Sequence, residues 1–520
     1  MKQLKVLLTA VVWLTYSNKL SAQIIPVWAT AYACNYPVFI NQNDMATDKN
    51  GNVYITGYTN DTSFNNVNAI TLKYNSSGQF QWAQYYDSIG YYTKIAIDDF
   101  GNSYISGLSS KGLLIIKYNT QGVLQWNKFY SNGNWALDII TDNLSNVYMV
   151  GLSNGNRHTT LKYNASGTLL WAAVDSILNG TGYSNIALDN AKNVYVTVRG
   201  DTTGYASTSN IIKYNSAGIK KWESIYKSNF SLGLSAPTDI KYHPSGFIYL
   251  LSNSTNNNNG DGDYVVVKYD TLGNQLWSLP YSFTSYYDVP KSMGVDKAGN
   301  VYVTGNIYPT GGTLDSIATI KISKSGVFKW KRTYSFGFSN LDEASGIAVD
   351  SLGFIYVTGQ SGGQAYKQNC VTLKYDSLGN QVWVGRYQNT LYSHDIANSI
   401  SLDKFANVYV SGTTGDGNSS GILTIKYSNA VGIQELTNNS NGIINVYPNP
   451  FDNFFIIKSN KNLSDAVLTL YDAFGKEVLK THNINNENII VQRNNLADGI
   501  YFFTLLENNQ IIDKGKVIAN

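Results

Sequence analysis

The sequence predicts an all-β protein, and three observations support this fold class. Tyr, Trp, Val, Ile, Thr, Asn and Gly dominate the composition, which favours strands and tight turns. Only 14% of the 520 residues are charged, so amphipathic helices with a charged outer face are not expected. The third observation is a stretch of sequence, DKNGNVYITG at residues 48–57, that returns along the chain with small changes.

This stretch belongs to a longer unit of four strand-length segments. In consensus order they read IAVD, IYVTG, TLKYD and QVWVGRY, separated by a turn, a variable loop and a second turn. The Asp of the first segment, or its substitute, falls at Asp48, Asp98, Asp142, Asp189, His243, Asp296, Asp350 and Asp403. The Lys of the third segment falls at Lys73, Lys117, Lys162, Lys213, Lys268, Lys321, Lys374 and Lys426. The Trp of the fourth segment falls at Trp28, Trp82, Trp126, Trp171, Trp222, Trp277, Trp330 and Trp383.

A repeat of about 45 to 55 residues with four short strands has the size of one β-propeller blade, which must pack against its neighbours around a ring. The first Trp, Trp28, precedes the first Asp, and no Trp of the repeat follows Lys426. We therefore expect the N-terminal strand to complete the last blade. Counting the innermost strands predicts an eight-bladed propeller, and the alternative is seven blades with one degenerate unit outside the ring.

The repeated residues are interpreted as scaffold. In DKNGN the Asp side chain can cap the turn, and the Gly can adopt the left-handed conformation that other residues avoid. The Tyr and Trp rings bury large apolar areas and keep one polar group for a hydrogen bond. A calcium loop is the functional alternative, but the later bidentate Glu of such loops is missing from the spacing.

These marks resemble the bacterial β-propeller repeats known as SBBP repeats. The resemblance covers residues 24 to about 430 and rests on the D..GN.Y.TG, KY and W positions. The name of that family means seven blades, whereas the count here is eight. The resemblance implies a fold and no defined activity.

The first 22 residues are expected to be a secretory signal peptide. Lys2 and Lys5 precede an apolar run from Val6 to Tyr16, and small residues follow at Ser21 and Ala22, where we expect cleavage. The run is too short for a spanning helix, so no transmembrane segment is expected. Cys34 and Cys370 are the only cysteines and do not form a disulfide framework, so two unpaired core residues are expected.

The repeats, residues 23–427, end in a polar stretch without periodicity at residues 428–442, which we interpret as a linker. Residues 443–520 then show alternating strand patterns such as AVLTLYDAFGKEV and GIYFFTLLENNQ, joined by turn signals. These patterns predict a small β-sandwich as a separate domain.

The last domain resembles the C-terminal (type A) sorting domain of type IX secretion cargo. The residues that carry the resemblance are Tyr447, Pro448, Asn449 and Pro450, then Leu496, Ala497, Asp498, Gly499, Ile500 and Tyr501, then Lys514, Gly515 and Lys516. The resemblance implies a partner, the type IX secretion machinery, which routes periplasmic proteins of Bacteroidota-type bacteria through the outer membrane. It also implies a location on the outer-membrane surface or in the extracellular space.

A search for catalytic motifs assigns no catalytic residue, cofactor or metal ligand. Three G-x-S-x-G matches, at residues 151–155, 359–363 and 417–421, follow predicted strands and enter loops, whereas a nucleophile elbow needs a strand that turns into a helix. The four histidines never approach metal-ligand spacing. Acid pairs from different blades cannot be recognised before the fold is known.

The variable loops are the better candidates for function, because they share one face of a propeller while the constant turns lie on the other. The ligand-binding candidates on this face are Tyr92, Trp135, Tyr183, Tyr287, Tyr392 and His394. Their rings could stack on sugars or grip a peptide, and the alternative is that they only cover the core. A second set of polar residues is expected just before the innermost strands, at the channel mouth: Asp44, Lys94, Asp138, Asn185, Asp239 and Ser292.

We therefore expect a secreted or cell-surface propeller that binds glycan or protein as an adhesion module. The alternative is a secreted enzyme, a hydrolase or lyase that acts on polysaccharide. The net charge of +3 gives no broad field for nucleic acid or anionic lipid, so neither partner is expected. A monomer is expected.

Overall fold

The computed structural model describes residues 22–33, 38–61, 67–87, 93–153, 155–175, 184–201, 207–228, 234–255, 262–283, 287–308, 315–336, 342–362, 367–389, 394–416, 420–429, 444–472, 477–507 and 510–519. All regular secondary-structure elements in these residues are β-strands. None of these residues forms a helix with the length and hydropathy of a membrane span. The chain divides into two compact units, Met1–Asn429 and Ala430–Asn520. The expected signal peptide lies almost wholly outside the described residues, so its cleavage site stays a prediction.

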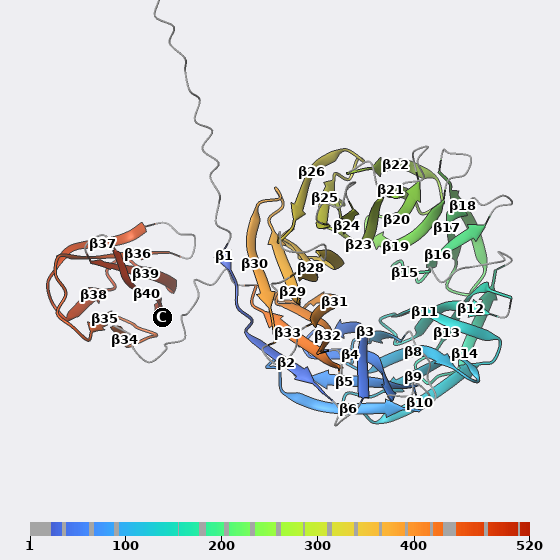
Figure 1. Ribbon diagram of the computed structural model, residues 1–520, viewed down its shortest axis with the longest axis horizontal. Helices are drawn as coiled ribbons and strands as arrows, with labels where there is room; N and C mark the ends of the chain where they lie inside the picture. Colours follow the sequence, from blue (N-terminus) through green and yellow to red (C-terminus); the bar gives the residue numbers. More distant parts are fainter. Residues whose placement is uncertain are drawn as a thin grey trace, which may run out of the picture. The chain divides into compact units, whose positions relative to one another are not determined.

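The first unit is a ring of antiparallel sheets whose strands run from the centre to the rim in chain order (Figure 1). The innermost strands are β3 (Val38–Thr47), β7 (Lys94–Ile97), β11 (Gly133–Thr141), β15 (Ile186–Leu188), β19 (Ser235–His243), β23 (Tyr287–Val295), β27 (Glu343–Val349) and β31 (His394–Leu402). The second strands are β4 (Val53–Asp61), β8 (Ser103–Ser109), β12 (Val147–Ser153), β16 (Val194–Asp201), β20 (Phe247–Thr255), β24 (Val301–Tyr308), β28 (Ile355–Gly362) and β32 (Val408–Gly415).

The two outer strands of each sheet complete the pattern. The third strands are β5 (Val67–Tyr74), β9 (Gly112–Tyr118), β13 (Arg157–Tyr163), β17 (Ser207–Tyr214), β21 (Gly262–Asp270), β25 (Ser316–Ile322), β29 (Gln368–Tyr375) and β33 (Ser420–Tyr427). The outermost strands are β6 (Phe80–Tyr86), β10 (Leu124–Tyr130), β14 (Leu169–Val174), β18 (Lys220–Tyr226), β22 (Gln275–Tyr281), β26 (Phe328–Tyr334), β30 (Gln381–Tyr387) and β2 (Trp28–Tyr32). In addition, β1 (Ala22–Gln23) runs parallel to β30.

The N-terminal strand completes the last sheet, as the sequence predicts. β2 pairs antiparallel with β33, with Trp28 opposite Lys426 and Thr30 opposite Thr424. The innermost strands contact one another in chain order from β3 to β31, and β31 in turn contacts β3. The ring is therefore closed by one strand from the start of the chain and three strands from its end. The blade number of eight stays a prediction, which this order of contacts supports over seven.

The repeated Asp holds the turn between the first and second strands. Asp48 Oδ1 accepts hydrogen bonds from the backbone N–H groups of Asn50 and Asn52, both at 2.9 Å, and Oδ2 accepts one from Asn52 Nδ2 at 2.7 Å. Gly51 in this turn has a φ of +77°, which favours glycine. Where His243 replaces the Asp, its Nδ1 lies 2.6 Å from Ser245 Oγ. The repeated turn is therefore scaffold, as predicted.

The repeated Trp, Lys and Gly fasten each sheet to the next. Trp82 Nε1 and Lys73 Nζ both donate to the carbonyl oxygen of Thr120, in the turn of the following sheet, at 3.1 and 2.8 Å. Gly122 in the same turn lies against the Trp82 ring, because a Cβ added there would be 2.7 Å from it. An indole and an ammonium also share one carbonyl oxygen at Ser76, Ala165, Ser216, Thr271, Lys324 and Ser377.

Trp383 departs from this pattern because the chain leaves the ring after Asn429. Lys374 Nζ still donates to the carbonyl oxygen and to Oδ1 of Asn429, at 3.2 and 2.7 Å. The buried indole N–H of Trp383, however, has no hydrogen-bond partner among the described residues. In the other sheets the turn continues into the outermost strand, whereas here that strand comes from the N-terminus. The missing bond therefore marks the place where the ring is closed.

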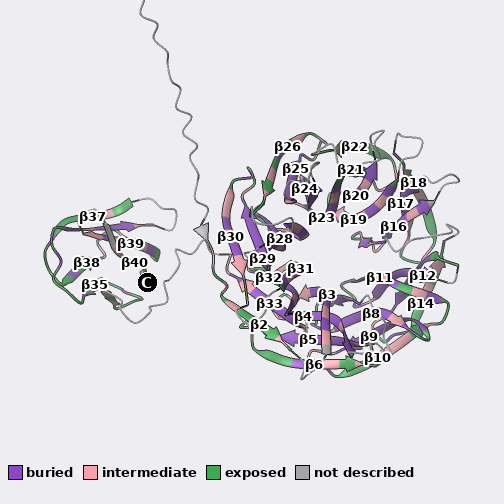
Figure 2. Cartoon of the chain, viewed as in Figure 1, coloured by how far each residue is buried: buried purple, intermediate pink, exposed green. Residues whose placement is uncertain are grey.

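The apolar cores lie between neighbouring sheets. One core, for example, joins Tyr54 and Ala69 of the first sheet to Ile105 and Leu114 of the second. Figure 2 shows that the second and third strands, such as β8 and β9, are mostly buried and that exposed residues gather on the outermost strands, such as β6. Cys370 in β29 is buried and free, and Cys34 lies outside the described residues.

The second unit contains two antiparallel sheets. One sheet has the order β34 (Ile444–Tyr447), β35 (Phe454–Ser459), β38 (Asn488–Gln492), and the other has the order β37 (Glu477–Ile484), β36 (Ala466–Tyr471), β39 (Gly499–Glu507), β40 (Gln510–Ala519). Residues of both sheets, including Phe455, Leu468 and Phe503, share a single core. This arrangement is the small β-sandwich that the sequence predicts.

Candidate functional site

The face with the variable loops carries an open hollow of about 740 Å³ at the second and third sheets. Its lining comes from the β8–β9 hairpin and from the segment that joins β10 to β11. The lining residues are Leu108, Ser109, Ser110, Lys111, Gly112, Ser131, Gly133 and Asn134. Most of them offer a hydroxyl, an amide or an ammonium group, so the hollow suits a polar ligand.

Short connections create the hollow. Only Ser110 and Lys111 separate β8 from β9, and the hairpin is held by Ser109 Oγ, which donates to Gly112 O at 3.0 Å and accepts from Lys111 N at 3.1 Å. Gly112 has a φ of +110°, and a Cβ there would lie 2.2 Å from Tyr130 O. Only glycine allows this close approach between the two connections, β8–β9 and β10–β11. Each has two residues, and the corresponding loops of the other sheets are longer.

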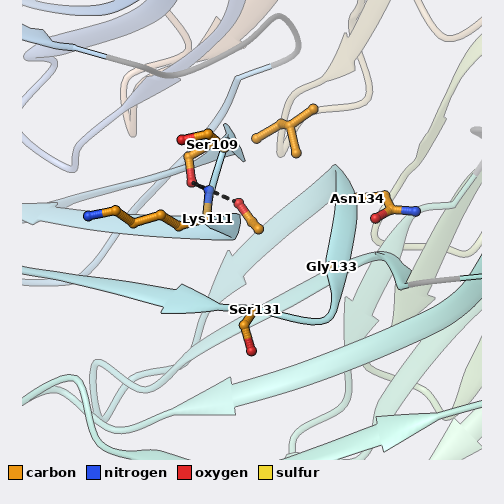
Figure 3. Close-up of a pocket in the computed structure, with 8 residues that line it drawn as sticks. Ser109, Lys111, Ser131, Gly133 and Asn134 are labelled. Carbon is orange, nitrogen blue, oxygen red and sulfur yellow. Dashed lines mark hydrogen bonds between the residues drawn. The ribbon is translucent and has the colours of Figure 1, made fainter.

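The polar groups around the hollow do not converge on one point. Figure 3 shows the Lys111, Ser131 and Asn134 side chains pointing in different directions. Lys111 Nζ lies 5.3 Å from the centre of the Phe129 ring, and Asn134 Nδ2 donates to Ser153 O at 3.5 Å. The arrangement can make dispersed hydrogen bonds to a ligand, which is typical of recognition.

Trp135 is the predicted site residue whose neighbour in the chain, Asn134, lines this hollow. It lies at a β-bulge, because Asn134 of β11 has no residue opposite it in β12. Its side chain is 42% exposed, so part of the ring is accessible to a ligand. Trp135 stands out in the sequence because it is not one of the eight Trp residues of the repeat, whereas Ser109, Lys111, Ser131 and Asn134 carry no such mark. The signal in the sequence that could have indicated the hollow is the short connection, residues 110–111, between the second and third segments of the second repeat.

Two other ligand-binding candidates, Tyr287 and His394, lie in the described residues and do not line the hollow. Tyr287 is 42% exposed at the start of β23, where its ring centre lies 6.4 Å from that of Tyr308. His394 is exposed at the start of β31. Both therefore belong to other sheets. Tyr92, Tyr183 and Tyr392 lie outside the described residues.

The expectation for the polar residues at the channel is wrong in one respect. Asp44, Asp138, Asp239 and Ser292 lie inside the innermost strands, and Lys94 begins one, instead of all preceding these strands. A β-bulge directly precedes Asp44, Asp138, Asp239 and Ser292, and each strand continues on the N-terminal side of this bulge, which the alternation of residues does not reveal. Asn185 does directly precede β15. No cluster of His, Cys, Asp or Glu in the described residues is suited to hold a metal ion.

The predicted sorting residues hold the last strand of the second unit in place. Asn449 Oδ1 accepts a hydrogen bond from Ile518 N at 2.9 Å, and Asn449 Nδ2 donates to Lys516 O at 3.0 Å. Tyr501 Oη donates to Ala497 O at 2.9 Å. Tyr447 is 45% exposed on β34, next to Pro448 and Pro450. Gly499 and Lys514 lie on β39 and β40.

Comparison with known proteins supports both units. Residues 445–520 match the family described as Secretion system C-terminal sorting domain, and residues 40–65, 276–308 and 332–366 match the family described as Beta-propeller repeat. The protein is thus a β-propeller with a type IX sorting domain, which indicates export to the outer-membrane surface or the extracellular space. The sorting domain also implies an interaction with the secretion machinery.

The chain is also similar to solved structures at low sequence identity. A catalytically inactive virginiamycin B lyase from Staphylococcus aureus is 12% identical, with 64% of this chain and 95% of that chain covered and a TM-score of 0.41. A lectin from Burkholderia pseudomallei is 10% identical, with coverages of 67% and 98% and a TM-score of 0.43. The WD40 domain of SCAP from fission yeast is 11% identical, with coverages of 78% and 98% and a TM-score of 0.46. No curated protein matches the chain.

Proposed function

We propose that this exported propeller is a binding module that recognises a glycan at the hollow beside Trp135. The observation that carries the proposal is an open hollow lined by hydroxyl, amide and ammonium groups, with a half-exposed Trp as the next residue in the chain. Sugars combine ring faces that stack on aromatic side chains with hydroxyl groups that accept and donate hydrogen bonds. A lining of this composition complements both features.

The spread of polar groups favours binding over chemistry. Hydrolysis of a polysaccharide uses two carboxyl groups that flank the scissile bond. Lys111 is the titratable residue in the lining, and its side chain points away from Asn134 in Figure 3. Recognition of a polar surface needs no such convergence, because several separate hydrogen bonds and one stacked ring suffice.

Loss of the Trp135 ring should weaken binding about thirtyfold, because truncation of a central stacked aromatic costs about 2 kcal/mol. The experiment is to screen the full chain on a glycan array and then to measure the affinity of Trp135→Ala for the strongest hit. Tyr287→Ala is the matched control, because Tyr287 is also 42% exposed but lies outside the hollow. The control should bind like the unmodified protein.

Two results would refute the proposal. One is a Trp135→Ala protein that binds with unchanged affinity and melts at a much lower temperature, since the ring would then serve only to cover the core. The other is a screen in which the chain turns over a polysaccharide or binds peptides but no glycan.

A further inference from the structure

Six exposed apolar side chains lie on the constant turns of the propeller. These turns join the first strand of a sheet to the second or the third to the fourth, so antiparallel pairing places all of them on one face, opposite the variable loops. Each side chain lies two residues after the Asp that caps its turn, and no other large apolar side chain of the described residues is as exposed, at 67 to 75%. We call these residues the apolar tips: Phe100, Leu144, Leu272, Leu352, Leu378 and Phe405.

The turn itself does not require an apolar side chain at this position. The residue there is held by its backbone, as Phe100 N donates to Asp98 Oδ1 at 3.0 Å. Asn50 and Gln121 occupy the same position in other turns and make the equivalent bond with their own N–H groups, at 2.9 and 3.0 Å. A Leu or Phe at this position therefore adds exposed apolar surface to the face without contributing to the turn.

Two of the apolar tips form a pair on the second and third sheets. Tyr104 Oη lies 3.1 Å from Asp98 Oδ2, in the turn of Phe100, and 3.3 Å from Ser145 O, in the turn of Leu144. One side chain thus contacts both turns. These two apolar tips belong to neighbouring turns on the same face.

Three more apolar tips gather on the seventh and eighth sheets, which are neighbours in the ring. A Cβ added to Gly353, next to Leu352, would lie 3.9 Å from the Cβ of Ser377, next to Leu378. The two turns of the seventh sheet are therefore in contact. Phe405 lies in the corresponding turn of the eighth sheet.

The apolar tips thus form three groups around the ring, because Leu272 lies by itself on the fifth sheet. Three separate points on a closed ring cannot lie on one line, so they define a plane. A folded partner protein covers a continuous patch of about 800 Å² on each side of the interface. Groups that lie on opposite sides of a ring instead suit a flat surface larger than the propeller.

The exposed charges of the same turns are mostly positive. The repeated Lys residues largely balance the Asp residues that cap the turns, so the residue after each capping residue decides the charge of the face. Lys404 Nζ lies 4.9 Å from the centre of the Phe405 ring, which places an ammonium group beside an apolar tip. Asp99 is the acidic residue at this position among the described turns. The exposed lysines at this position are Lys49, Lys297, Lys324 and Lys404.

We propose that the constant face binds the surface of a lipid bilayer with anionic headgroups, with the apolar tips inserted among the acyl chains. The net charge of +3 gives no long-range attraction to such a surface, so insertion at contact is the main source of affinity, and the lysines meet the headgroup phosphates. Export to the outer-membrane surface or the extracellular space brings the protein to lipid. The hollow beside Trp135 then faces away from the bilayer, and the proposal does not depend on glycan binding there.

Co-sedimentation with lipid vesicles tests this proposal. The protein is used without residues 1–22, the expected signal peptide, because the apolar run of that segment would itself bind lipid. Vesicles of phosphatidylcholine with phosphatidylglycerol as the minor component should bind the protein saturably. Vesicles of phosphatidylcholine alone should bind it more weakly, because insertion of the apolar tips remains while the contact with anionic headgroups is lost.

Serine variants separate insertion from other contacts, because Ser166 already occupies this turn position and makes the same backbone bond. Leu272→Ser and Leu352→Ser should each lower the partition coefficient about tenfold, with an unchanged melting temperature. A variant with serine at all six apolar tips should not bind measurably. The matched controls are Ile225→Ser on β18 and Ile490→Ser on β38, both 60% exposed, which should bind like the unmodified protein.

Three results would overturn the proposal. One is the absence of binding to either kind of vesicle. Another is binding that high salt abolishes and the serine substitutions do not change, because lipid would then only adsorb the protein through charge. The third is an unmodified protein that forms dimers in size-exclusion chromatography and ignores vesicles, while the six-serine variant is a monomer, because the apolar tips would then join two copies of the chain.

Discussion

Deleting residues 24–33 should open the ring and cause the protein to aggregate. The deletion removes β2, so β33 becomes an unpaired edge, and an exposed edge strand is a template for aggregation. It also removes Trp28, whose ring contacts Tyr74 and Tyr409 and whose indole donates to Ser76 O. Truncation of a fully buried Trp costs about 3 to 5 kcal/mol, and the loss of the half-buried Trp28 should cost part of this amount. Size-exclusion chromatography and thermal melting check this result.

A rearranged chain provides the matched control for this deletion. In this variant residues 24–33 follow Ser428 through a copy of the turn at residues 119–123, so that β33 continues into β2 as β9 continues into β10. This protein should be monomeric and should melt at or above the temperature of the unmodified protein. A deletion variant that stays monomeric with an unchanged melting temperature would show that β2 does not close the ring.

Removing residues 443–520 should leave the protein in the periplasm. These residues form the sorting sandwich, whose match to the secretion family spans 445–520. The propeller should still fold, because its sheets contain no strand beyond Asn429. Fractionation of the native host, with trypsin resistance of the periplasmic product as the test of folding, measures both expectations.

A point variant refines the sorting prediction. Asn449→Ala removes the two hydrogen bonds to Ile518 N and Lys516 O and so loosens β40, the last strand. It should reduce surface display strongly. The control is His482→Ala, which changes an exposed residue of β37 and should leave surface display unchanged. In the reverse experiment, residues 430–520 fused to a periplasmic reporter should carry it to the surface. Normal display of the truncated protein would contradict the role of this domain.

The fold could be predicted largely from the repeat, because each mark has a local role. The turn residues of DKNGN act within five positions of one another, and Asp48 caps that turn as expected. The offset of Trp28 likewise predicts the pairing of β2 with β33. The contacts between sheets could not be predicted in this way. Lys73 and Trp82 meet Thr120 only because neighbouring sheets stack, and no local pattern shows which turn each indole reaches.

The candidate site was less predictable for a similar reason. Trp135 stands out because it breaks the repeat, but the hollow beside it depends on Gly112 and on the closeness of two connections from different parts of the repeat. The hydrogen bond that Asp138 Oδ2 accepts from Ile186 N is equally hidden, because Ile186 is in another sheet and a β-bulge shifts the register before Asp138. Exposed apolar side chains such as Phe100 and Leu352 also lie on the constant turns, where the sequence suggested only scaffold.

Hydrogen exchange with and without the glycan found by screening tests the central claim most directly. Bound ligand slows exchange where it covers backbone amides or steadies them. Recognition at the hollow predicts slower exchange in peptides that contain residues 108–112 and 131–135, with no change in the turns at residues 48–52 and 98–102 on the opposite face. Protection confined to those constant turns, or to segments far from Trp135, would contradict the account.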